Sequence, residues 1–239
     1  KPIAIGTNTD PYQPIEKTHK IMRGVLKVLA EFNHPVTIVT KSALVTRDAD
    51  ILGPMGEKGL ARVALSLTTL DAGLSRKMEP RAATPQRRLW ALRQLNAVGC
   101  PTAVMLAPMI PAINDHELEA LIRAAAVSGA KGASFIVLRL PLEVRDLFVE
   151  WLEEHFPDRA KRVMRYVREL HGGKDYDPQW GKRLTGEGVY ADLIRRRFHR
   201  AAAQHGLARE NPPFRCDLFQ VPAAETPQFS FMDRLTKDG

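Results

Sequence analysis

Short runs of apolar and β-branched residues alternate with longer segments of helical periodicity through the first 140 residues. Such alternation is typical of βαβ units and of a mainly parallel sheet. We expect five strands, at residues 3–6, 36–40, 62–66, 102–107 and 134–138. Each carries few charges, as expected where helices cover the outside of a parallel sheet or barrel.

Helical spacing of apolar residues recurs between the expected strands, at residues 16–32, 85–98 and 115–128. Thr84 before Pro85 and Asn114 before an acidic turn indicate helix starts, and Gly99 and Gly129 indicate helix ends. After residue 138 the alternation stops, and helices are expected at 142–155, 158–170 and 189–205. The pattern therefore predicts an α/β core at residues 1–140, a helical C-terminal region at 141–210 and an extended tail at 211–239.

The amino-acid composition does not change the predicted fold. Hydrophobic residues make up 44% of the chain and charged residues 26%, which is ordinary for a soluble globular protein. The long apolar stretch at residues 101–113 is too short and too rich in proline to span a bilayer, and no charged-then-apolar leader is visible. We therefore expect a cytoplasmic protein without a membrane partner.

Cysteine and charge narrow the range of functions further. The two cysteines, Cys100 and Cys216, form neither a disulfide framework nor a Cys-x-x-Cys motif. Lysine and arginine outnumber the acids by 35 to 27, for a net charge of +8, and arginine clusters in RAKRVMRYVREL and LIRRRFHR. This balance suits an anionic partner such as a nucleic acid, or else an arginine-rich solvated helix face. No basic segment is interleaved with aromatic residues as in a groove that stacks bases.

Polar side chains gather at the predicted ends of the strands. In a parallel barrel the carboxyl ends of the strands meet at one mouth, where functional groups collect. The residues at these ends are Thr7, Asn8, Thr9 and Asp10; Thr40, Lys41 and Ser42; Ser66, Thr68 and Thr69; Ala107, Pro108 and Met109; and Arg139. An acid, a lysine, hydroxyls and an arginine in one ring would suit a zwitterionic or phosphorylated small molecule. The alternative is that they are ordinary turn and loop residues.

Other chemistry has weaker signals. Glu79 beside Arg81 either orients a ligand or forms a local ion pair. The seven histidines lack metal-ligand spacing, so the sequence predicts no metal site, and it assigns no catalytic residue. Walker A, GxGxxG and GxSxG motifs are absent from the sequence. An ordinary barrel lyase or aldolase with Lys41 as Schiff-base nucleophile stays an alternative, which borohydride trapping would test.

Several of these segments, taken in order, resemble the radical S-adenosylmethionine (SAM) superfamily, in its spore photoproduct lyase-like, DNA repair photolyase-like branch. They are IAIGTNTDPYQPIE, VTIVTKSALVTRD, RVALSLTTLD, MEPRAATPQRR, VMLAPMIPAIND and LRLPLEVRDLF, and GGKDYDP and GEGVYADLIRRRF resemble the same branch's C-terminal part. The resemblance implies a partial (β/α)6 TIM-like barrel with a helical C-terminal extension. Five visible units leave the first strand and its cluster loop unaccounted for.

The family's first loop normally carries Cys-x3-Cys-x2-Cys, which holds a [4Fe-4S] cluster that cleaves SAM to a 5′-deoxyadenosyl radical. This chain has no such motif. The resemblance therefore implies that the ligand cysteines lie upstream of Lys1, and that this chain alone is inactive without them. The alternative is a cluster-free, degenerate barrel that binds SAM or a nucleotide-like ligand without catalysis.

Site residues carried over from the family lie at the strand ends. Thr9 and Asp10 match positions near the methionine end of SAM, Lys41 matches a lysine that can meet its carboxylate, and Ser66 and Thr68 match positions beside SAM. The segment from Ala107 through Pro108 to Met109 matches backbone that borders the adenine. The resemblance further implies an electron donor as partner and a nucleic acid or another large anion as substrate of a lyase-like reaction.

Overall fold

A computed structural model of the protein describes residues 1–179, 181–208 and 212–222. Its centre is one five-stranded parallel sheet, in which the strands follow each other in chain order. The strands are β1 (Ile3–Ile5), β2 (Val36–Thr40), β3 (Ala61–Ser66), β4 (Thr102–Met109) and β5 (Gly132–Val137). The expected α/β fold with a partial barrel is confirmed, and the observed strands differ from the expected ones by at most two residues at each end.

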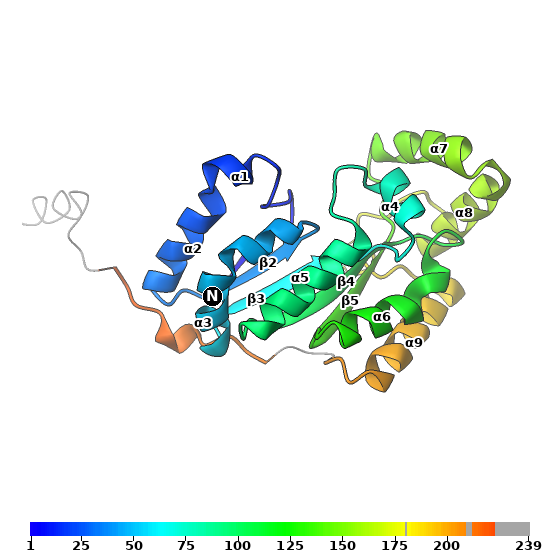
Figure 1. Cartoon of the computed structure of the whole chain (residues 1–239). Helices are drawn as coiled ribbons and strands as arrows, with labels where there is room; N and C mark the ends of the chain where they lie inside the picture. Colours follow the sequence, from blue (N-terminus) through cyan, green and yellow to red (C-terminus); the bar gives the residue numbers. More distant parts are fainter. Residues whose placement is uncertain (180, 209–211, 223–239) are drawn as a thin grey trace, which may run out of the picture.

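One face of the sheet carries the main core. Alternate side chains of the strands, such as Ile38, Val63 and Val104, are fully buried. The helices that follow the strands lie on that side of the sheet (Figure 1). The intervening residues are less buried, and Thr37, Arg62 and other side chains of the opposite face line a hollow of about 640 Å³. The strands thus have a dry outer face and an open inner face, as in a barrel that is not closed.

The helices of the core begin with an interrupted one. Residues 16–32 form two helices, α1 (Glu16–His19) and α2 (Ile21–Glu31), because Lys20 between them adopts the left-handed conformation with φ of 52°. The single helix that was expected here is therefore wrong. Later helices are α5 (Pro85–Ala97) and α6 (Leu118–Val127), the latter preceded by the 3-10 turn η2 (Asp115–Glu117).

Two helices of the core were not expected from the sequence. The turn η1 (Ala43–Asp48) leads into α3 (Ala49–Glu57), which contains Pro54. A shorter helix, α4 (Ala72–Met78), follows β3 and starts at Asp71, whose side chain accepts a hydrogen bond from the backbone N–H of Leu74 (2.7 Å). Both lie between a strand and the next, so they complete the βαβ pattern.

Within the described residues, three α-helices follow the sheet, as expected: α7 (Val144–His155), α8 (Pro157–Leu170) and α9 (Gly188–Gln204). Apart from Leu170, the buried residues of α7 and α8 form a second core with Ile110 and Leu138 at the strand ends. Helix α9 packs beside α6, and its Phe198 contacts Phe135 of β5 with ring centroids 4.8 Å apart. In Figure 1, α7 lies above the carboxyl end of the sheet and α9 lies beside α6.

The predicted tail is only partly described, because residues 211 and 223–239 lie outside the described residues. Residues 212–222 include a short turn, η3 (Cys216–Leu218), and return to the sheet's amino end. There the N–H of Arg215 donates to Gly59 and that of Gln220 donates to Phe32, and Arg62 stacks on Phe214.

The two edges of the sheet differ. At the β5 edge, Val137 donates a backbone hydrogen bond to Leu184, and Gly132 forms a bridge with Ala208. At the β1 edge, no strand of the described residues pairs with the outer side, and Ile3 is 42% exposed. Helix α2 beside it shows a stripe of exposed apolar residues, Ile21, Val25 and Val28. The β1 end of the sheet is therefore the less covered one.

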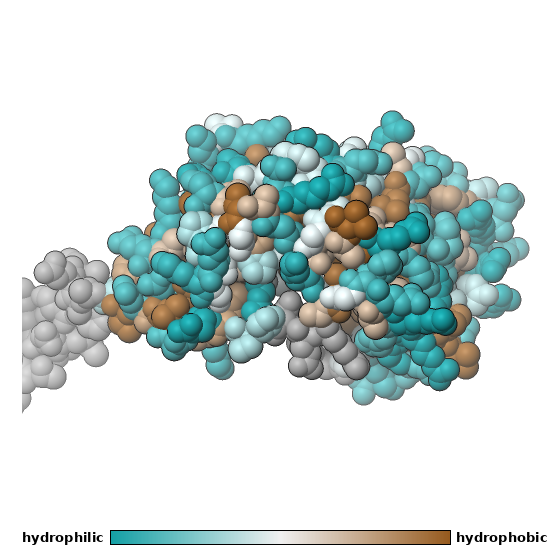
Figure 2. Space-filling model, turned by 60° about the horizontal axis from the view of Figure 1, so that its bottom comes forward, coloured by the Kyte–Doolittle hydropathy of each residue, from teal (hydrophilic) through white to brown (hydrophobic). Residues whose placement is uncertain are grey.

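One face of the molecule is mainly hydrophilic (Figure 2). On the face shown in Figure 2, hydrophobic residues form small groups among hydrophilic ones. None of the helices within the described residues has the length and apolar character that crossing a membrane requires.

Candidate functional site

The loops after β1 and β2 meet through Asp10. Its carboxylate accepts hydrogen bonds from the backbone N–H of Tyr12 (2.9 Å), the hydroxyl of Thr40 (2.7 Å) and the backbone N–H of Lys41 (2.8 Å). Thr9 is exposed in the same loop. The expected neighbours Thr9, Asp10 and Lys41 therefore lie at one part of the mouth, and Asp10 fixes two loops to each other.

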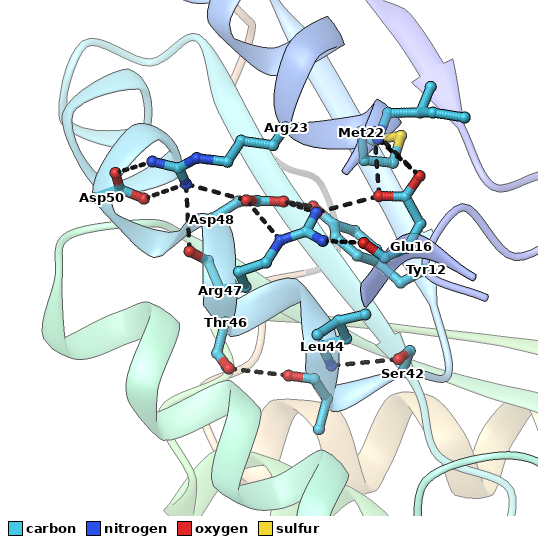
Figure 3. Close-up of polar contacts among 12 residues, drawn as sticks. Tyr12, Glu16, Met22, Arg23, Ser42, Leu44, Thr46, Arg47, Asp48 and Asp50 are labelled. Atoms are coloured by element: carbon cyan, nitrogen blue, oxygen red, sulfur yellow. Dashed lines mark hydrogen bonds and ion pairs between the residues drawn. The ribbon is translucent and has the colours of Figure 1, made fainter. Parts of the chain in front are cut away.

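A buried polar network holds the first loop in place (Figure 3). Asp48, which is fully buried, accepts a hydrogen bond from the hydroxyl of Tyr12 (3.1 Å) and pairs with Arg47 and Arg23. Arg47 also reaches Glu16, which accepts the first N–H groups of α2. Burial and the neighbouring charge of Asp48 raise the pKa of Tyr12, so it stays a neutral donor. The loop that carries Asp10 is thus attached to the segment between β2 and α3.

A second network is centred on Glu79, just beyond α4. Its carboxylate pairs with Lys41 through one oxygen, and with the buried Arg88 (2.6 Å) and the hydroxyl of Thr68 (2.9 Å) through the other. Arg88 also donates to the backbone carbonyl of Ser66 (3.0 Å). Burial of Glu79 opposes ionisation, but the charges of Arg88 and Lys41 outweigh burial and lower its pKa. Glu79 therefore remains ionised and holds the Lys41 ammonium at the mouth.

Asn114 joins the ends of two strands. It is fully buried, and its side-chain amide donates to the backbone carbonyls of Thr68 (2.8 Å) and Pro108 (2.9 Å). Its side-chain oxygen accepts the N–H of Ile110 (2.6 Å). The residue was expected to cap a helix, but the structure gives it no cap hydrogen bond and places it between the loops after β3 and β4. Its hydrogen bonds therefore fix the position of Pro108 relative to the loop after β3.

Lys41 lies between two hollows. The more polar hollow, of about 470 Å³, is lined by Asp10, Tyr12, Gln13, Pro14, Lys17, Lys41, Ser42, Leu44, Arg81, Ala82 and Ala83. The more apolar one, of about 350 Å³, is lined by Lys41, Met78, Glu79, Pro108, Ile110, Leu138, Val144, Leu147, Phe148 and Trp151. Its aromatic wall is a stacked pair, Phe148 and Trp151, with ring centroids 5.7 Å apart. One cation thus borders both a polar space and an apolar space of ligand size.

The other expected residues lie below or beside these hollows. Ser66 and Thr68 are buried beneath the Glu79 network, and Met109 is buried under the strand end. Ala107 precedes Pro108 in β4 and is half-buried. Arg139, expected in the same ring, donates instead to the hydroxyl of Tyr176 (3.0 Å) and lines neither hollow.

Glu79 and Arg88 are the main residues that sequence reasoning missed in their roles. Glu79 was considered only as a ligand contact or as a partner of Arg81, whereas its ion-pair partners are Lys41 and Arg88. Arg88 lies in an amphipathic helix, and as a charged residue it was not expected on the buried face. The signal that could have found it is its spacing to Leu92 and Leu95, because positions i, i+4 and i+7 share one face of a helix, here the buried one.

Metal binding finds no support among these residues. Within the described residues there is no group of three histidine, cysteine or acidic side chains that could hold a metal ion. Cys100 is buried, which raises the pKa of its thiol to about 12, and Cys216 is exposed in η3. An iron-sulfur cluster held by cysteine thiolates therefore does not fit the residues present here.

Comparison with known proteins gives the family of the chain and several of its relatives. The sequence model of the Radical SAM superfamily matches residues 3–125. An uncharacterized protein of Mycobacterium tuberculosis, Rv2578c, is 33% identical over 213 residues, which are 88% of this chain and 59% of that protein. An uncharacterized protein of Methanocaldococcus jannaschii, MJ0683, is 30% identical over 48% of this chain and 43% of its own length.

Solved structures of spore photoproduct lyase mutants share the fold. One has a TM-score of 0.54 and 16% sequence identity, over 87% of this chain and 59% of that one. Another, with a TM-score of 0.53, contains bound AdoMet and dinucleoside spore photoproduct. The present chain spans 59% of the length of its mycobacterial relative, so these matches concern part of a longer architecture.

Proposed function

Because the chain belongs to the radical SAM superfamily, we propose that its mouth binds SAM for a radical SAM enzyme whose cluster ligands lie outside these 239 residues. The observation that carries this proposal is the position of Lys41. It is held by Glu79 between a polar and an apolar hollow, and SAM has a zwitterionic amino acid at one end and a flat base at the other.

In this proposal SAM has one orientation in the mouth. Lys41 would meet the carboxylate as a charge-assisted donor, and Asp10, beside the polar hollow, would face the ammonium together with Thr9. The base would enter the apolar hollow, which Pro108 lines, with Ala107 and Met109 as its neighbours in β4. Ser66 and Thr68 act from below, because they hold Arg88 and Glu79 and so fix Lys41.

The cluster does not fit this chain, and its cysteines are proposed to belong to a further βα unit. Two features of the structure support such a unit: the outer edge of β1, which no strand of the described residues pairs with, and the exposed apolar stripe on α2. The match covers only 59% of the mycobacterial relative, whose remaining length agrees with a further βα unit. In this arrangement residues 1–140 bind and orient SAM and helix α7 covers the apolar side of the mouth, while an external donor supplies electrons.

A nucleic acid is the proposed substrate class, with a lyase-like repair reaction as the proposed chemistry. The support is the net charge of +8 and the fold shared with a lyase whose structure holds a dinucleoside photoproduct. Shared fold alone does not determine the substrate.

The test of the SAM site is a calorimetric titration of SAM into the wild-type chain and into Lys41→Ala. Loss of a charge-assisted hydrogen bond costs about 1.5–3 kcal/mol, so we expect affinity to fall about 10- to 100-fold. Lys27→Ala, an exposed lysine of α2, is the matched control and should bind SAM like the wild type. Unchanged binding by Lys41→Ala, with unchanged circular dichroism, would show that the mouth has been assigned wrongly.

A second candidate function is supported by the lack of a metal-binding group among the described residues: a cluster-free barrel that binds SAM or a nucleotide without chemistry. The two candidate functions predict a different iron content of the protein. A longer form that includes upstream sequence, reconstituted anaerobically, should bind iron and cleave SAM if the first proposal holds. A longer form that binds SAM but neither takes up iron nor cleaves SAM would favour the second.

A further inference from the structure

The outer face of α8 carries a concentration of cations. Four exposed basic side chains lie on it: Arg159, Lys161, Arg162 and Arg165. Across residues 1–179, 181–208 and 212–222, no carboxylate forms an ion pair with any of the four, whereas the nearby Arg168 pairs with Asp175 (2.7 Å). Like charges three or four residues apart on a helix destabilise it by about 0.2–0.5 kcal/mol per pair. Asp158 and Glu169 lie four residues from Arg162 and Arg165 but form no ion pair with them, so the cations of this face remain available to an anionic partner.

An aromatic pair lies within this face. The guanidinium carbons of Arg162 and Arg165 are 5.7 and 5.2 Å from the ring centroid of Tyr166. Tyr166 stacks on Tyr190 of α9, with ring centroids 4.8 Å apart and ring planes inclined by 20°. The two tyrosines are far apart in sequence, so their pairing could not be seen in the basic segments themselves. Folding therefore produces an arrangement of arginine and stacked aromatic rings.

The face adjoins the mouth. Arg159 donates to the backbone carbonyl of Ala112 (3.5 Å), and the hydroxyl of Tyr190 donates to Asp115. Ala112 and Asp115 both belong to the segment that follows β4 at the carboxyl end of the sheet. In Figure 1, α8 is the neighbour of α7, which lies above that end. A long ligand at the mouth could therefore also lie along α8.

We propose that this face of α8, defined as Arg159, Lys161, Arg162, Arg165 and Tyr166, binds the phosphate backbone of a nucleic acid strand. Guanidinium groups bind phosphate through paired hydrogen bonds, and a helix separates residues three apart by about 4.5 Å along its axis, so several cations can follow one strand. The stacked tyrosines offer a flat surface beside it. The inference deepens the proposed function. It rests on that function for the reaction that the nucleic acid would undergo, but not for binding of the strand to this face.

An anionic membrane fits this face less well. A helix that lies on a membrane inserts apolar residues next to its cations. The apolar residues of α8, Val163, Met164 and Val167, are buried in the second core instead. The exposed side of the helix is thus left with charge and tyrosine only.

The experiment measures binding of a fluorescein-labelled single-stranded oligonucleotide to the full chain by fluorescence anisotropy at several salt concentrations, without SAM. We expect Arg162→Gln/Arg165→Gln to weaken binding about tenfold, and to reduce the slope of log K against log salt concentration by about 1.4, as expected for two lost phosphate contacts. Arg159→Gln/Lys161→Gln should weaken binding similarly.

The matched control is Arg93→Gln/Arg123→Gln, which removes the same charge from exposed positions of α5 and α6. It should keep affinity within about twofold. If the control lost as much affinity for the oligonucleotide as Arg162→Gln/Arg165→Gln, the proposal would be overturned. Binding of phosphatidylserine vesicles without binding of the oligonucleotide would also overturn it. A titration of SAM into the wild-type chain separates the two proposals. If the wild-type chain binds SAM but does not bind the oligonucleotide, the nucleic acid surface on α8 is refuted and the proposed SAM site is not.

Discussion

At the scale of single residues, Glu79 shows how much one side chain can organise. It lies just beyond a short helix, yet it contacts a lysine 38 residues before it and an arginine nine residues after it. Its carboxylate is almost fully buried, so each charge around it interacts through a medium of low polarisability. Removing the charge of Glu79 would leave Arg88 buried without a carboxylate partner.

We therefore expect Glu79→Gln to lower the free energy of unfolding by about 3 kcal/mol, since removing one partner of a buried ion pair costs about this much. Urea unfolding at pH 7 measures the change. Glu119→Gln is the matched control, because its pair with Arg197 is on the surface and should contribute less than about 1 kcal/mol. Similar losses in the two variants would contradict the role assigned to Glu79.

The same carboxylate makes stability depend on pH. The pKa of Glu79 in the folded state lies below its ordinary value of 4.5, so the folded form binds its proton less readily than the unfolded form. Its contribution is therefore complete above about pH 4.5 and is lost as pH falls through the folded pKa. In urea unfolding curves below pH 4.5, we expect the wild type to lose stability more steeply than Glu79→Gln; parallel losses would count against this sign.

At the scale of elements, sequence pattern sufficed where burial and periodicity agree. The strands of the sheet alternate between a buried face and a partly exposed one, and each was predicted within two residues at either end. Helix α3 was missed because Gly53, Pro54 and Gly56 interrupt its pattern. The two glycines serve packing: a Cβ on Gly53 would lie 2.3 Å from the carbonyl of Val98, and one on Gly56 would lie 2.7 Å from Cys100. Close helix packing therefore outweighed helix propensity.

The site divides in a similar way. Strand ends bring Asp10, Lys41 and Pro108 to the mouth because parallel strands share one direction, and sequence alone could predict that. The pairing of Lys41 with Glu79 depends on where a loop folds back over the sheet, and no local pattern encodes that. The expected SAM contacts therefore stay predictions, while the polar network that would support them comes from the structure.

The break between α1 and α2 gives a prediction at this scale. Lys20 has φ of 52°, which costs a residue with a Cβ about 1–2 kcal/mol and costs glycine nothing. Lys20→Gly should therefore raise the free energy of unfolding by about 0.5 kcal/mol, after the added entropy of the unfolded chain is subtracted. Lys27→Gly, within α2, should lower it by about 1 kcal/mol. Thermal and urea unfolding compare the two, and a loss in both would argue for a continuous helix.

At the scale of the whole molecule, the sheet is asymmetric. Its β5 edge is covered by segments around Leu184 and Ala208, while its β1 edge has no partner among the described residues. An uncovered edge presents unpaired backbone groups to any strand that reaches it. The 239-residue chain, taken alone, should therefore associate through β1.

A substitution on β1 tests this expectation. Ile3→Lys places a charge on the exposed edge strand and should reduce the concentration-dependent increase in mass seen by static light scattering. Val127→Lys is the control, because Val127 is 79% exposed at the end of α6 and lies away from that edge. Equal effects of both substitutions would indicate general surface hydrophobicity instead of edge pairing.

The strictly sequential order of the strands has a consequence for how the architecture can be assembled. Each strand pairs only with its neighbours in the chain, so a strand joining at β1 would break no existing ladder and displace no loop. The sheet can therefore be extended at β1 without re-pairing its five strands, by a strand of the same polypeptide or of another one. A single ladder of backbone hydrogen bonds would hold the added strand.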